Sequence, residues 1–570
     1  MKRGLLLALL IAVLPIISYT QEIDMENAIR NMYAGTSMEE MTSDEVEHFE
    51  NLARRPVKLN DADVGELMQS GLLSSFQIAS LLDYRARHGN VLSLTELANL
   101  DGFNSEFVRG ISAFILIDDG EVLLHQSSDR RFCADISTRC TYKLETGPDL
   151  TRRYSAATKL RMSVADMFSC SFSFSKPYDF KNLDCTLFGG NLSLQYRGFK
   201  IRIGDFNARF GQGLCLWNTM QISSTTSAAA LMLKPTGFSS SYSFTGSSAL
   251  TGASVEAGFA RWRISTGAFM PQVKKRGFRA GMSEITSVTN VHRTGRYGHL
   301  GVSHSMTFSN QPGRGISVPS LRTSSDFAVC IKGVNVYGEV AYDWRSVKCG
   351  TVTGIDFTVG EYLRLASRLR YLPFSDEHGA VAIGEYTYRR LKGTLSLDLL
   401  YHPEDHTRQF RIQSLLQYTI GAHMQLKLRF SERIRDWGNP FRTDIRADLS
   451  FDNDVFVSNI RVNPLWCEGF SIMSYIEAGY KAKALSVYLR EGIFAVDEWN
   501  DRIYVYERDA PGNFNVPALY GRGVWTSFYL SWRFFRKGRL YCKATYMSYP
   551  FMKIRKPGRA ELKLMLTVRF

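Results

Sequence analysis

Histidine is the residue type whose grouping in this sequence could support catalysis, because imidazole transfers protons near neutral pH. His292, His299 and His304 lie in one short segment. With scattered Ser and Asp they could form a lipid-modifying site at the rim of a membrane protein, although such spacing is common by chance. No Gly-x-Ser-x-Gly elbow, His-Glu-x-x-His motif, phosphate loop or calcium loop occurs in the sequence. We therefore predict a protein that is not an enzyme and has no catalytic residues, cofactor or metal site.

Lysine and arginine form the second chemically informative set, because many of them occupy alternate positions of predicted strands. They are Lys159, Arg161, Lys200, Arg202, Arg364, Arg368, Arg370, Arg411, Lys427, Arg429, Lys563 and Arg569. A lumen lined by these side chains would concentrate anions. An equally supported interpretation pairs them with Asp and Glu inside the protein, or with lipid phosphates at its rims.

Charge divides the chain into two parts of opposite sign. Residues 21–119 hold 18 acidic and 7 basic side chains, a net charge of -11, whereas the whole chain carries +14. The first twenty residues contribute +2, so residues 120–570 carry +23. The sequence therefore predicts an acidic head on a basic body.

The N-terminal residues 1–20 are typical of a cleaved signal peptide, since Lys2 and Arg3 precede an apolar run from Leu5 to Ile17. The first cysteine is Cys133, so no lipid-acceptor cysteine follows the predicted cleavage near Gln21. All nine cysteines lie in the body without a CxxC pair, which argues against a zinc site or a complete disulfide framework.

The body, residues 120–570, alternates apolar and polar residues with period two. In the last segment, Leu562, Leu564, Leu566, Val568 and Phe570 share one face, and the mostly polar residues Glu561, Lys563, Met565, Thr567 and Arg569 share the other. The charged side chains at alternate positions cannot face lipid, and the long rows of apolar side chains between them cannot face water. A closed antiparallel transmembrane β-barrel satisfies both faces and pairs every backbone group, so we predict a mainly β protein of about 18–24 strands, even in number.

Three features favour this barrel over its rival, a soluble β-sandwich or propeller: strands of about 9 to 12 residues, tight hairpins, and the terminal Phe570. A last strand that ends in Phe resembles the signal by which bacterial barrels are recognised by the barrel-assembly machinery. Aromatic residues at predicted strand ends fit interfacial girdles in outer-membrane lipid; they are Tyr371, Tyr401, Tyr418, Trp344 and Trp532. Four longer segments are predicted as extracellular loops or lumen fillers, namely Thr219 to Ser239, Pro271 to Arg293, Ser309 to Ser325 and Asp497 to Gly521.

The head begins with an acidic helical segment, residues 21–56, which we interpret as a solvated lead-in. Residues 57–119 then divide into short helices, with caps predicted at Asn60, for a helix through Leu67, and at Ser93 and Asn104. A further helix is predicted over Phe76 to Arg87. Tight connections at Gly71 and Gly102 join these helices into two successive helix-hairpin-helix units.

This pattern resembles the tandem helix-hairpin-helix domain of competence DNA-receptor proteins. The resemblance rests on Val57-Lys58-Leu59-Asn60, Glu66-Leu67, Leu82-Asp83-Tyr84-Arg85, His88-Gly89 and Leu97 through Gly102-Phe103. It implies partner or phosphate contacts at Gly71, Leu72, Gly102, Phe103, Lys58, Arg85, Arg87 and Arg109. In that family each hairpin reads Pro-Gly-Ile-Gly, but here Ser70 and Asp101 replace the prolines, and Leu73 and Asn104 replace the second glycines. Residues 57–117 also carry a net charge of -3, which disfavours binding of nucleic acid.

A second resemblance covers both head and body. Two segments are similar to segments of Bacteroidota outer-membrane proteins that join such a head to a barrel: Gly204-Asp205-Phe206-Asn207-Ala208-Arg209-Phe210-Gly211-Gln212-Gly213-Leu214 and Tyr504-Val505-Tyr506-Glu507-Arg508-Asp509-Ala510-Pro511-Gly512. The glycines around Asp205 and Arg209 predict a kinked strand held by an ion pair between these two residues. A ligand-contact role for the loop is the alternative.

Together these features predict a bacterial outer-membrane β-barrel whose periplasmic head docks a protein partner or occludes the pore. The predicted role is passage, export or assembly of macromolecules at the outer membrane. The alternative is a DNA-uptake channel whose head binds DNA.

Overall fold

A computed structural model of the chain describes residues 28, 32–33, 38–117, 132–146, 151–164, 167–176, 187–218, 226–241, 249–259, 261–271, 284–311, 315–436, 438–453, 455–535, 537–552 and 557–570. The predicted signal peptide, residues 1–20, lies outside the described residues.

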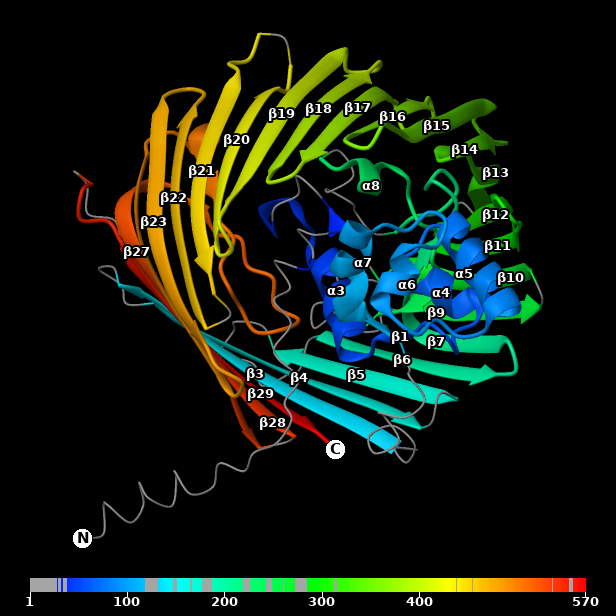
Figure 1. Cartoon of the computed structure of the whole chain (residues 1–570), viewed down its shortest axis with the longest axis horizontal. Coiled ribbons are helices and arrows are strands. Elements are labelled where there is room, and N and C mark those ends of the chain that lie inside the picture. Colours follow the sequence, from blue (N-terminus) through cyan, green and yellow to red (C-terminus); the bar gives the residue numbers. More distant parts are fainter. Residues whose placement is uncertain are drawn as a thin grey trace.

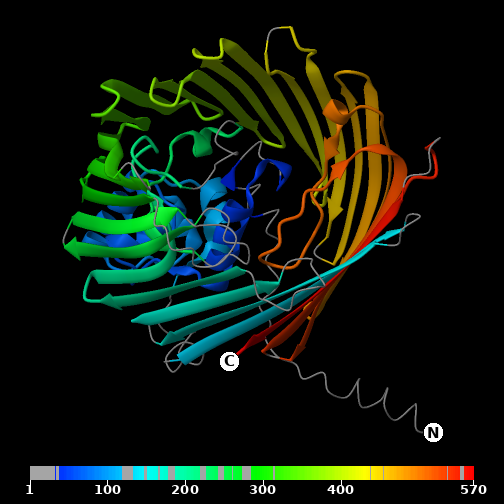
Figure 2. The same ribbon diagram turned by 180° about the vertical axis from the view of Figure 1, so that it is seen from behind.

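Antiparallel strands close into one large barrel (Figures 1 and 2), because the last strand, β29, pairs with the first, β3, from Gly558 opposite Thr146 to Arg569 opposite Asp135. Strands β8 and β9 lie end to end against β7, so the described wall has 24 strands, an even number at the upper end of the predicted range. The wall consists of β3 (Phe132–Thr146), β4 (Thr151–Val164), β5 (Phe168–Lys176), β6 (Leu187–Tyr196), β7 (Phe199–Arg209), β8 (Gly237–Ser240), β9 (Leu250–Phe259), β10 (Trp262–Pro271), β11 (Glu284–Thr294), β12 (Gly298–Gln311), β13 (Gly315–Ile331), β14 (Val334–Asp343), β15 (Lys348–Val359), β16 (Leu363–Leu372), β17 (Glu377–Tyr388), β18 (Leu391–His402), β19 (Thr407–Ile420), β20 (Met424–Ile434), β21 (Arg442–Asp452), β22 (Phe456–Trp466), β23 (Phe470–Lys481), β24 (Leu485–Val496), β27 (Gly521–Phe535), β28 (Gly538–Ser548) and β29 (Gly558–Arg569).

Side chains on the two faces of the wall differ as the alternation predicts. On β29, Leu562, Leu564 and Leu566 are 40 to 42% exposed on the outside, whereas Met565 is 2% exposed on the inside. The predicted girdle residues Trp344, Tyr371, Tyr418 and Trp532 are exposed near strand ends, and Tyr401 is half-buried. A closed antiparallel wall with an apolar exterior is the architecture of an outer-membrane β-barrel.

The two rims of the barrel differ in the length of their connections. At one rim, hairpins such as Arg197–Gly198 and Lys332–Gly333 have two residues, both with positive φ, which suits the right-handed twist of the strands. The opposite rim carries the long connections, residues 210–236 and 497–520. The predicted loop Ser309 to Ser325 is wrong, because β12 and β13 extend through most of it as paired strands; β11 likewise begins at Glu284, inside the predicted loop Pro271 to Arg293.

The head consists of short helices around one apolar core that includes Leu67, Leu81, Leu97 and Phe114. Its elements are η1 (Met38–Glu40), α3 (Ser43–Arg54), β1 (Val57–Lys58), α4 (Val64–Gln69), α5 (Ser75–His88), α6 (Leu94–Ala98), α7 (Ser105–Ile111), η2 (Ser112–Phe114) and β2 (Ile115–Leu116), with β1 parallel to β2. None of the described helices is long and apolar enough to cross a lipid bilayer.

The predicted caps are confirmed at Ser93 and Asn104, whose side chains accept the backbone N–H of Glu96 and Phe107. The cap predicted at Asn60 is wrong, since Asp63 caps α4. Asn60 instead exchanges two hydrogen bonds with the backbone of Val91, at 2.9 and 3.0 Å, and so ties the two halves of the head together.

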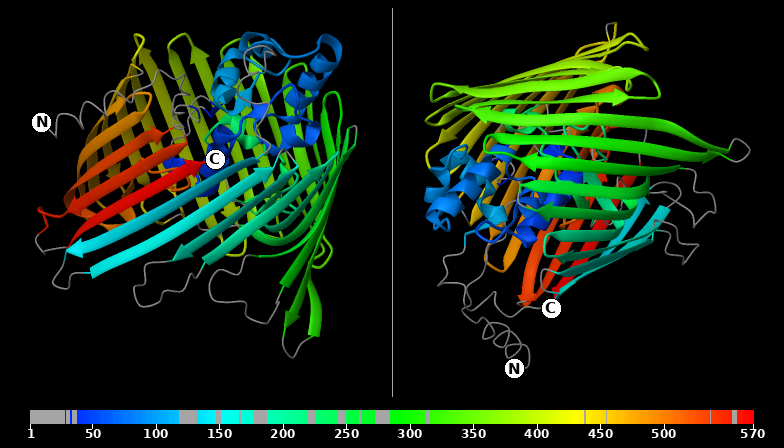
Figure 3. Two further views of the ribbon diagram at one scale, coloured as in Figure 1. Left: turned by 90° about the horizontal axis from the view of Figure 1, so that it is seen from below. Right: turned by 90° about the vertical axis from the view of Figure 1, so that its right-hand side faces the viewer.

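The head lies within the ring of strands and at one end of it (Figures 1 and 3). The interpretation of the acidic segment as solvated is wrong for the described part of α3, where Val46 and Phe49 are buried in the head core. The polar side of α3 is also engaged, because its acidic side chains meet basic side chains of the wall. Two segments of the long-loop rim fold inward and reach the head: residues 226–236, with α8 (Ala228–Leu231), and residues 499–520, with η4 (Trp499–Asp501), β25 (Ile503–Tyr504) and β26 (Ala518–Leu519). We refer to them as the inner loop and the inner strap.

Candidate functional site

The head enters the barrel at the short-turn rim. Glu66 accepts a hydrogen bond of 2.9 Å from Gln195, which lies next to the Arg197–Gly198 turn. Arg55 donates to Ser163, the penultimate residue of β4, at 2.8 Å. Because both wall residues lie beside short turns, these contacts place the outer part of the head at that rim.

Glu39 is the carboxylate of the head that lies deepest among wall arginines. Its oxygens accept from Arg461 at 2.6 Å and from Arg446 at 3.3 Å, and all three side chains are at least 91% buried. Tyr506 of the inner strap also donates its backbone N–H to Glu39, at 3.2 Å. One carboxylate therefore joins the head to two wall strands, β21 and β22, and to the strap.

Burial alone would raise the pKa of Glu39. The charges of Arg446 and Arg461, with the hydrogen bond from Arg461, outweigh that effect and hold the pKa well below its usual range. Glu39 is therefore ionised at every pH at which the protein would normally be studied.

Helix α3 extends this contact with a row of polar side chains. Glu47 accepts from Lys159 at 3.1 Å, and Asn51 accepts from Arg161 at 3.4 Å. Glu50 accepts the backbone N–H of Gly512 in the inner strap at 2.5 Å. We refer to the contacts of Glu39, Glu47 and Glu50 as the acidic seam.

Two further contacts of the head with the wall use uncharged side chains. Gln69 accepts from Lys200 at 2.8 Å and donates to Glu256 at 3.0 Å, while Glu256 is already paired with Arg202 at 2.5 Å. Ser75, the first residue of α5, lies 2.6 Å from His299 Nδ1. We refer to the contacts of Gln69 and Ser75 as the neutral seam.

The inner loop meets the first hairpin of the head. Lys234 donates to the backbone oxygen of Leu72 at 2.6 Å and lies 5.8 Å from the centre of the Phe107 ring. Burial, with the nearby charge of Arg364, lowers the pKa of Lys234 to about 8. Helix α8 fastens the loop to the wall, because Glu385 accepts the N–H of Ala228 at 2.8 Å.

The inner strap is held by buried ion pairs. Asp509 accepts from Lys563 at 2.6 Å and from Lys543 at 3.3 Å, and Glu507 accepts from Lys543 at 2.7 Å. Arg508 reaches Glu477 at 3.1 Å. Head, inner loop and inner strap therefore meet inside the barrel, leaving a polar cleft of about 310 Å³ between α3 and strands β4 to β7.

The predicted basic residues do not form one continuous unpaired surface. Three of them contact the head, namely Lys159, Arg161 and Lys200. Others pair with acidic side chains: Arg202 with Glu256, Arg364 with Asp356, Arg370 with Glu377 and Asp398, Arg429 with Asp444, Lys563 with Asp509, and Arg569 with Asp135. Arg368 donates to the Leu231 carbonyl, Arg411 donates to Gln413, and Lys427 lies opposite Asp448.

The two predicted hairpins occupy different surroundings. Gly71 has φ 62°, and a Cβ there would lie 3.3 Å from Thr236 of the inner loop, so the first hairpin is covered. Leu72 is 2% exposed. Gly102 has φ 83°, and a Cβ there would lie 2.8 Å from the Phe76 ring, while Phe103 packs into the head core.

The four predicted cations of the head do not converge on a hairpin through the described contacts. Arg85 donates to the Ala62 carbonyl at 2.8 Å, and Arg87 pairs with Asp83 at 2.8 Å. Lys58 and Arg109 are exposed.

At the glycine motif of β7, the backbone of β7 passes close to the backbone of β6. Gly204 has φ 104°, and a Cβ there would lie 2.2 Å from the Gly190 oxygen. The predicted ion pair between Asp205 and Arg209 is wrong. Asp205 accepts from Thr251 at 2.7 Å and from the Gly190 N–H at 3.0 Å, and the guanidinium carbon of Arg209 lies 6.0 Å from the centre of the Trp217 ring.

The residues of the motif that follow β7 bind a carboxylate of the wall, Glu339. Glu339 accepts the backbone N–H groups of Gln212 and Leu214 at 2.6 and 3.0 Å. Gly211 (φ 59°) and Gly213 (φ 92°) allow this turn. The contacts support a structural role for the motif.

The three histidines of the predicted rim cluster separate onto two faces. His304 is exposed and bonds Thr323 at 3.0 Å, whereas His292 and His299 point inward, with ring centres 4.7 Å apart. At the end of the chain, Phe570 is half exposed, and its N–H donates to the Ala134 carbonyl at 2.8 Å.

Sequence reasoning missed the head residues that contact the wall or the inner strap, among them Glu39, Glu47, Glu50, Gln69 and Ser75. The opposite net charges of head and body were the available signal, because opposite charges inside one exported chain favour contact. The individual partners are more than 100 residues apart along the chain and have no local signature.

Comparisons with known proteins give only distant structural similarities. No family model matches the chain, and no curated protein matches its sequence. Among solved structures, OccK3 (OpdO) of Pseudomonas aeruginosa is 10% identical, covering 77% of this chain and 95% of its own, with a TM-score of 0.32. The siderophore receptor PirA of the same organism is 7% identical, covering 76% and 80%, with a TM-score of 0.40. The P pilus usher PapC translocation pore is 8% identical, covering 77% and 99%, with a TM-score of 0.37.

Proposed function

We propose that the chain is a gated outer-membrane pore in which the head, residues 57–119 with the acidic segment 21–56, is the plug. The role is passage, export or assembly of macromolecules at the outer membrane. A periplasmic or outer-membrane protein partner binds the exposed side of the head and releases it. Glu39 carries the proposal, because a carboxylate from the head is buried between two arginines of the wall.

The unequal rims support a periplasmic position for the head. Outer-membrane barrels have short periplasmic turns and longer extracellular loops. The head contacts the wall beside two short turns, while the inner loop and inner strap come from the long-loop rim. The plug is thus met from the opposite side by two segments of the barrel.

Single-channel conductance of the full-length protein in planar bilayers tests the plug. We expect wild type to pass little current, and Glu39→Gln combined with Glu47→Gln to give frequent large openings, since both changes weaken the acidic seam. Asp83→Asn, which breaks an exposed pair within the head, is the matched control and should stay closed. A wild-type protein that is fully open would overturn the proposal.

A DNA-uptake channel has less support, because the first hairpin is covered by the inner loop. Lys58 and Arg109 remain exposed and could contact phosphates. Gel-shift of the full-length protein with duplex DNA at low salt distinguishes the two functions. Binding that weakens steeply with salt and with Lys58→Ala and Arg109→Ala favours uptake, and absence of binding removes it.

A further inference from the structure

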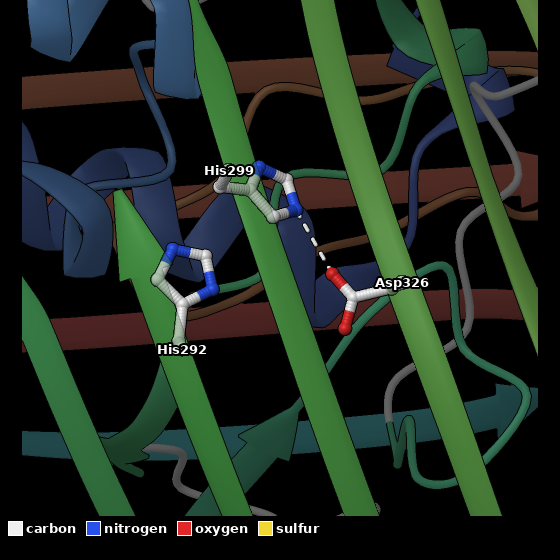
Figure 4. A group of neighbouring side chains, drawn as sticks. All are labelled: His292, His299 and Asp326. Carbon is white, nitrogen blue, oxygen red and sulfur yellow. Dashed lines mark hydrogen bonds and ion pairs between the residues drawn. The ribbon is translucent and has the colours of Figure 1, made fainter. Parts of the chain in front are cut away.

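His292, His299 and Asp326 meet on the inner face of three neighbouring strands (Figure 4). His292 of β11 lies opposite Gly301 of β12, and Gly301 lies opposite Asp326 of β13. His299 precedes Gly301 by two residues and therefore shares its face of the wall. A Cβ at residue 301 would lie 2.3 Å from Asp326 Oδ1, so glycine provides the space into which this carboxylate leans.

The three side chains are almost completely buried, with exposed fractions of 2% for His292, 6% for His299 and 1% for Asp326. His299 Nε2 lies 2.9 Å from Asp326 Oδ2. Two polar atoms of the group, His292 Nε2 and Asp326 Oδ1, have no hydrogen-bond partner among the described residues. A buried polar atom without a partner is costly, so this group has an unsatisfied requirement that a bound species would meet.

The chemistry of the group fits a cation. One ligand atom from each of the three residues lies within 4.8 Å of the others. Two imidazoles and one carboxylate form a common three-residue ligand set for Zn²⁺, with a fourth position left open, and imidazole selects transition metals over Mg²⁺ or Ca²⁺. Small rotations of the side chains would bring the three atoms to a common ion.

We propose that His292, His299 and Asp326 form a binding site for a divalent transition-metal ion, Zn²⁺ being the best fit. The sequence predicts no metal site, because the three residues follow no metal-binding spacing. The site lies on the barrel wall beneath α5 and is separate from the acidic seam.

Ser75 of the head makes a hydrogen bond to one of the proposed ligands, His299. Its Oγ lies 2.6 Å from His299 Nδ1, so it can accept the Nδ1–H and leave Nε2 free to bind the metal. Metal binding and docking of the head should therefore favour each other, a consequence that rests on the proposed plug function.

The positive charge of Arg263 beside the site allows a test of whether the bound species is a cation or an anion. Arg263 lies opposite His292 on β10, is 5% exposed, and its guanidinium nitrogens have no hydrogen-bond partner among the described residues. Its charge repels a cation, whereas an anion at the same place would need it. Arg263→Gln should therefore tighten metal binding several-fold, although it would abolish binding of an anion.

The experiment measures Zn²⁺ and Co²⁺ bound to chelator-stripped, full-length protein in detergent, by elemental analysis after equilibrium dialysis and by Co²⁺ absorption. We expect one ion per chain, lost in His292→Gln and in Asp326→Asn and weakened about tenfold in Ser75→Ala. His304→Gln, on the outer face of β12, is the matched control and should bind as wild type does.

Far-UV circular dichroism and the heat-dependent gel shift of barrels verify that each variant is folded. No metal above the level of the His292→Gln protein would overturn the proposal, as would weaker binding in Arg263→Gln. Conductance is not the readout, so an open wild-type pore would refute the plug without refuting the metal site.

Discussion

The acidic seam and the neutral seam hold the same head by different physics. At the acidic seam, Glu39 pairs with Arg446 and Arg461, and Arg461 also pairs with Asp448 of the wall. Separating head and wall therefore removes the carboxylate partner of the buried Arg446. At the neutral seam, Gln69 and Ser75 only add to wall pairs that exist without them, Arg202 with Glu256 and His299 with Asp326. We therefore expect the neutral seam to open before the acidic seam.

Among the variants, Glu39→Gln should lower the protease resistance of the head most. Removing one partner of a buried ion pair destabilises the folded state by about 3 to 5 kcal/mol. In Glu39→Gln the acidic seam would then hold the head about as weakly as the neutral seam does. Protease resistance of the head in the full-length protein should fall strongly, while Asp83→Asn leaves it unchanged. Wild-type resistance in Glu39→Gln would contradict the assignment of the acidic seam as the stronger one.

Acidification should weaken the head through His48, a residue of α3 that bonds the Ser70 carbonyl at 2.8 Å. Burial, with the charge of Arg209, lowers its pKa from 6.5 to about 4. The folded state then binds fewer protons than the unfolded state, so stability is full above pH 6.5 and falls as the pH drops toward 4.

The lowered pKa of Glu39 acts in a different window, since its contribution is present above the usual carboxyl range and is lost only below it. Thermal unfolding at pH 7 and pH 5 should therefore differ in wild type and differ less in His48→Gln. An equal pH dependence in the two proteins would assign the effect to another group.

Glu47→Gln should have an intermediate effect. Its pair with Lys159 is mostly buried, and a hydrogen bond to a charged group contributes about 2 kcal/mol. Protease resistance should fall less than in Glu39→Gln. The reverse order would mean that α3, rather than Glu39, anchors the head.

Gln69→Ala should have the smallest effect, about 1.5 kcal/mol, because Gln69 itself carries no charge, although its partners Lys200 and Glu256 do, and the pair of Arg202 with Glu256 remains. Since Gln69 and Glu39 share no partner, the double variant should show the sum of the two losses. A loss in Gln69→Ala as large as in Glu39→Gln would remove the distinction between the seams.

Much of the barrel could be predicted from the sequence, since alternation is a local property. The row Leu562, Leu564, Leu566 alone indicates which face is outside, because strand side chains alternate regardless of what lies further away. Helix signals were equally local, as Ser93 and Asn104 show, although Asn60 misled because its side chain serves a distant backbone group. The interpretation of α3 as solvated failed because the acidic composition of the helix does not show whether basic side chains from elsewhere in the chain pack against it.

The sequence by itself determined the class of the fold, the two-part charge division and the turns at Gly71 and Gly102, because each follows from periodicity, composition or backbone conformation within a few residues. Only the tertiary structure decided that Glu39 meets Arg446 and Arg461, that the inner loop covers the first hairpin, and that His292, His299 and Asp326 converge. These contacts depend on strand register and on closure of the barrel, which bring together residues that have no relation along the chain.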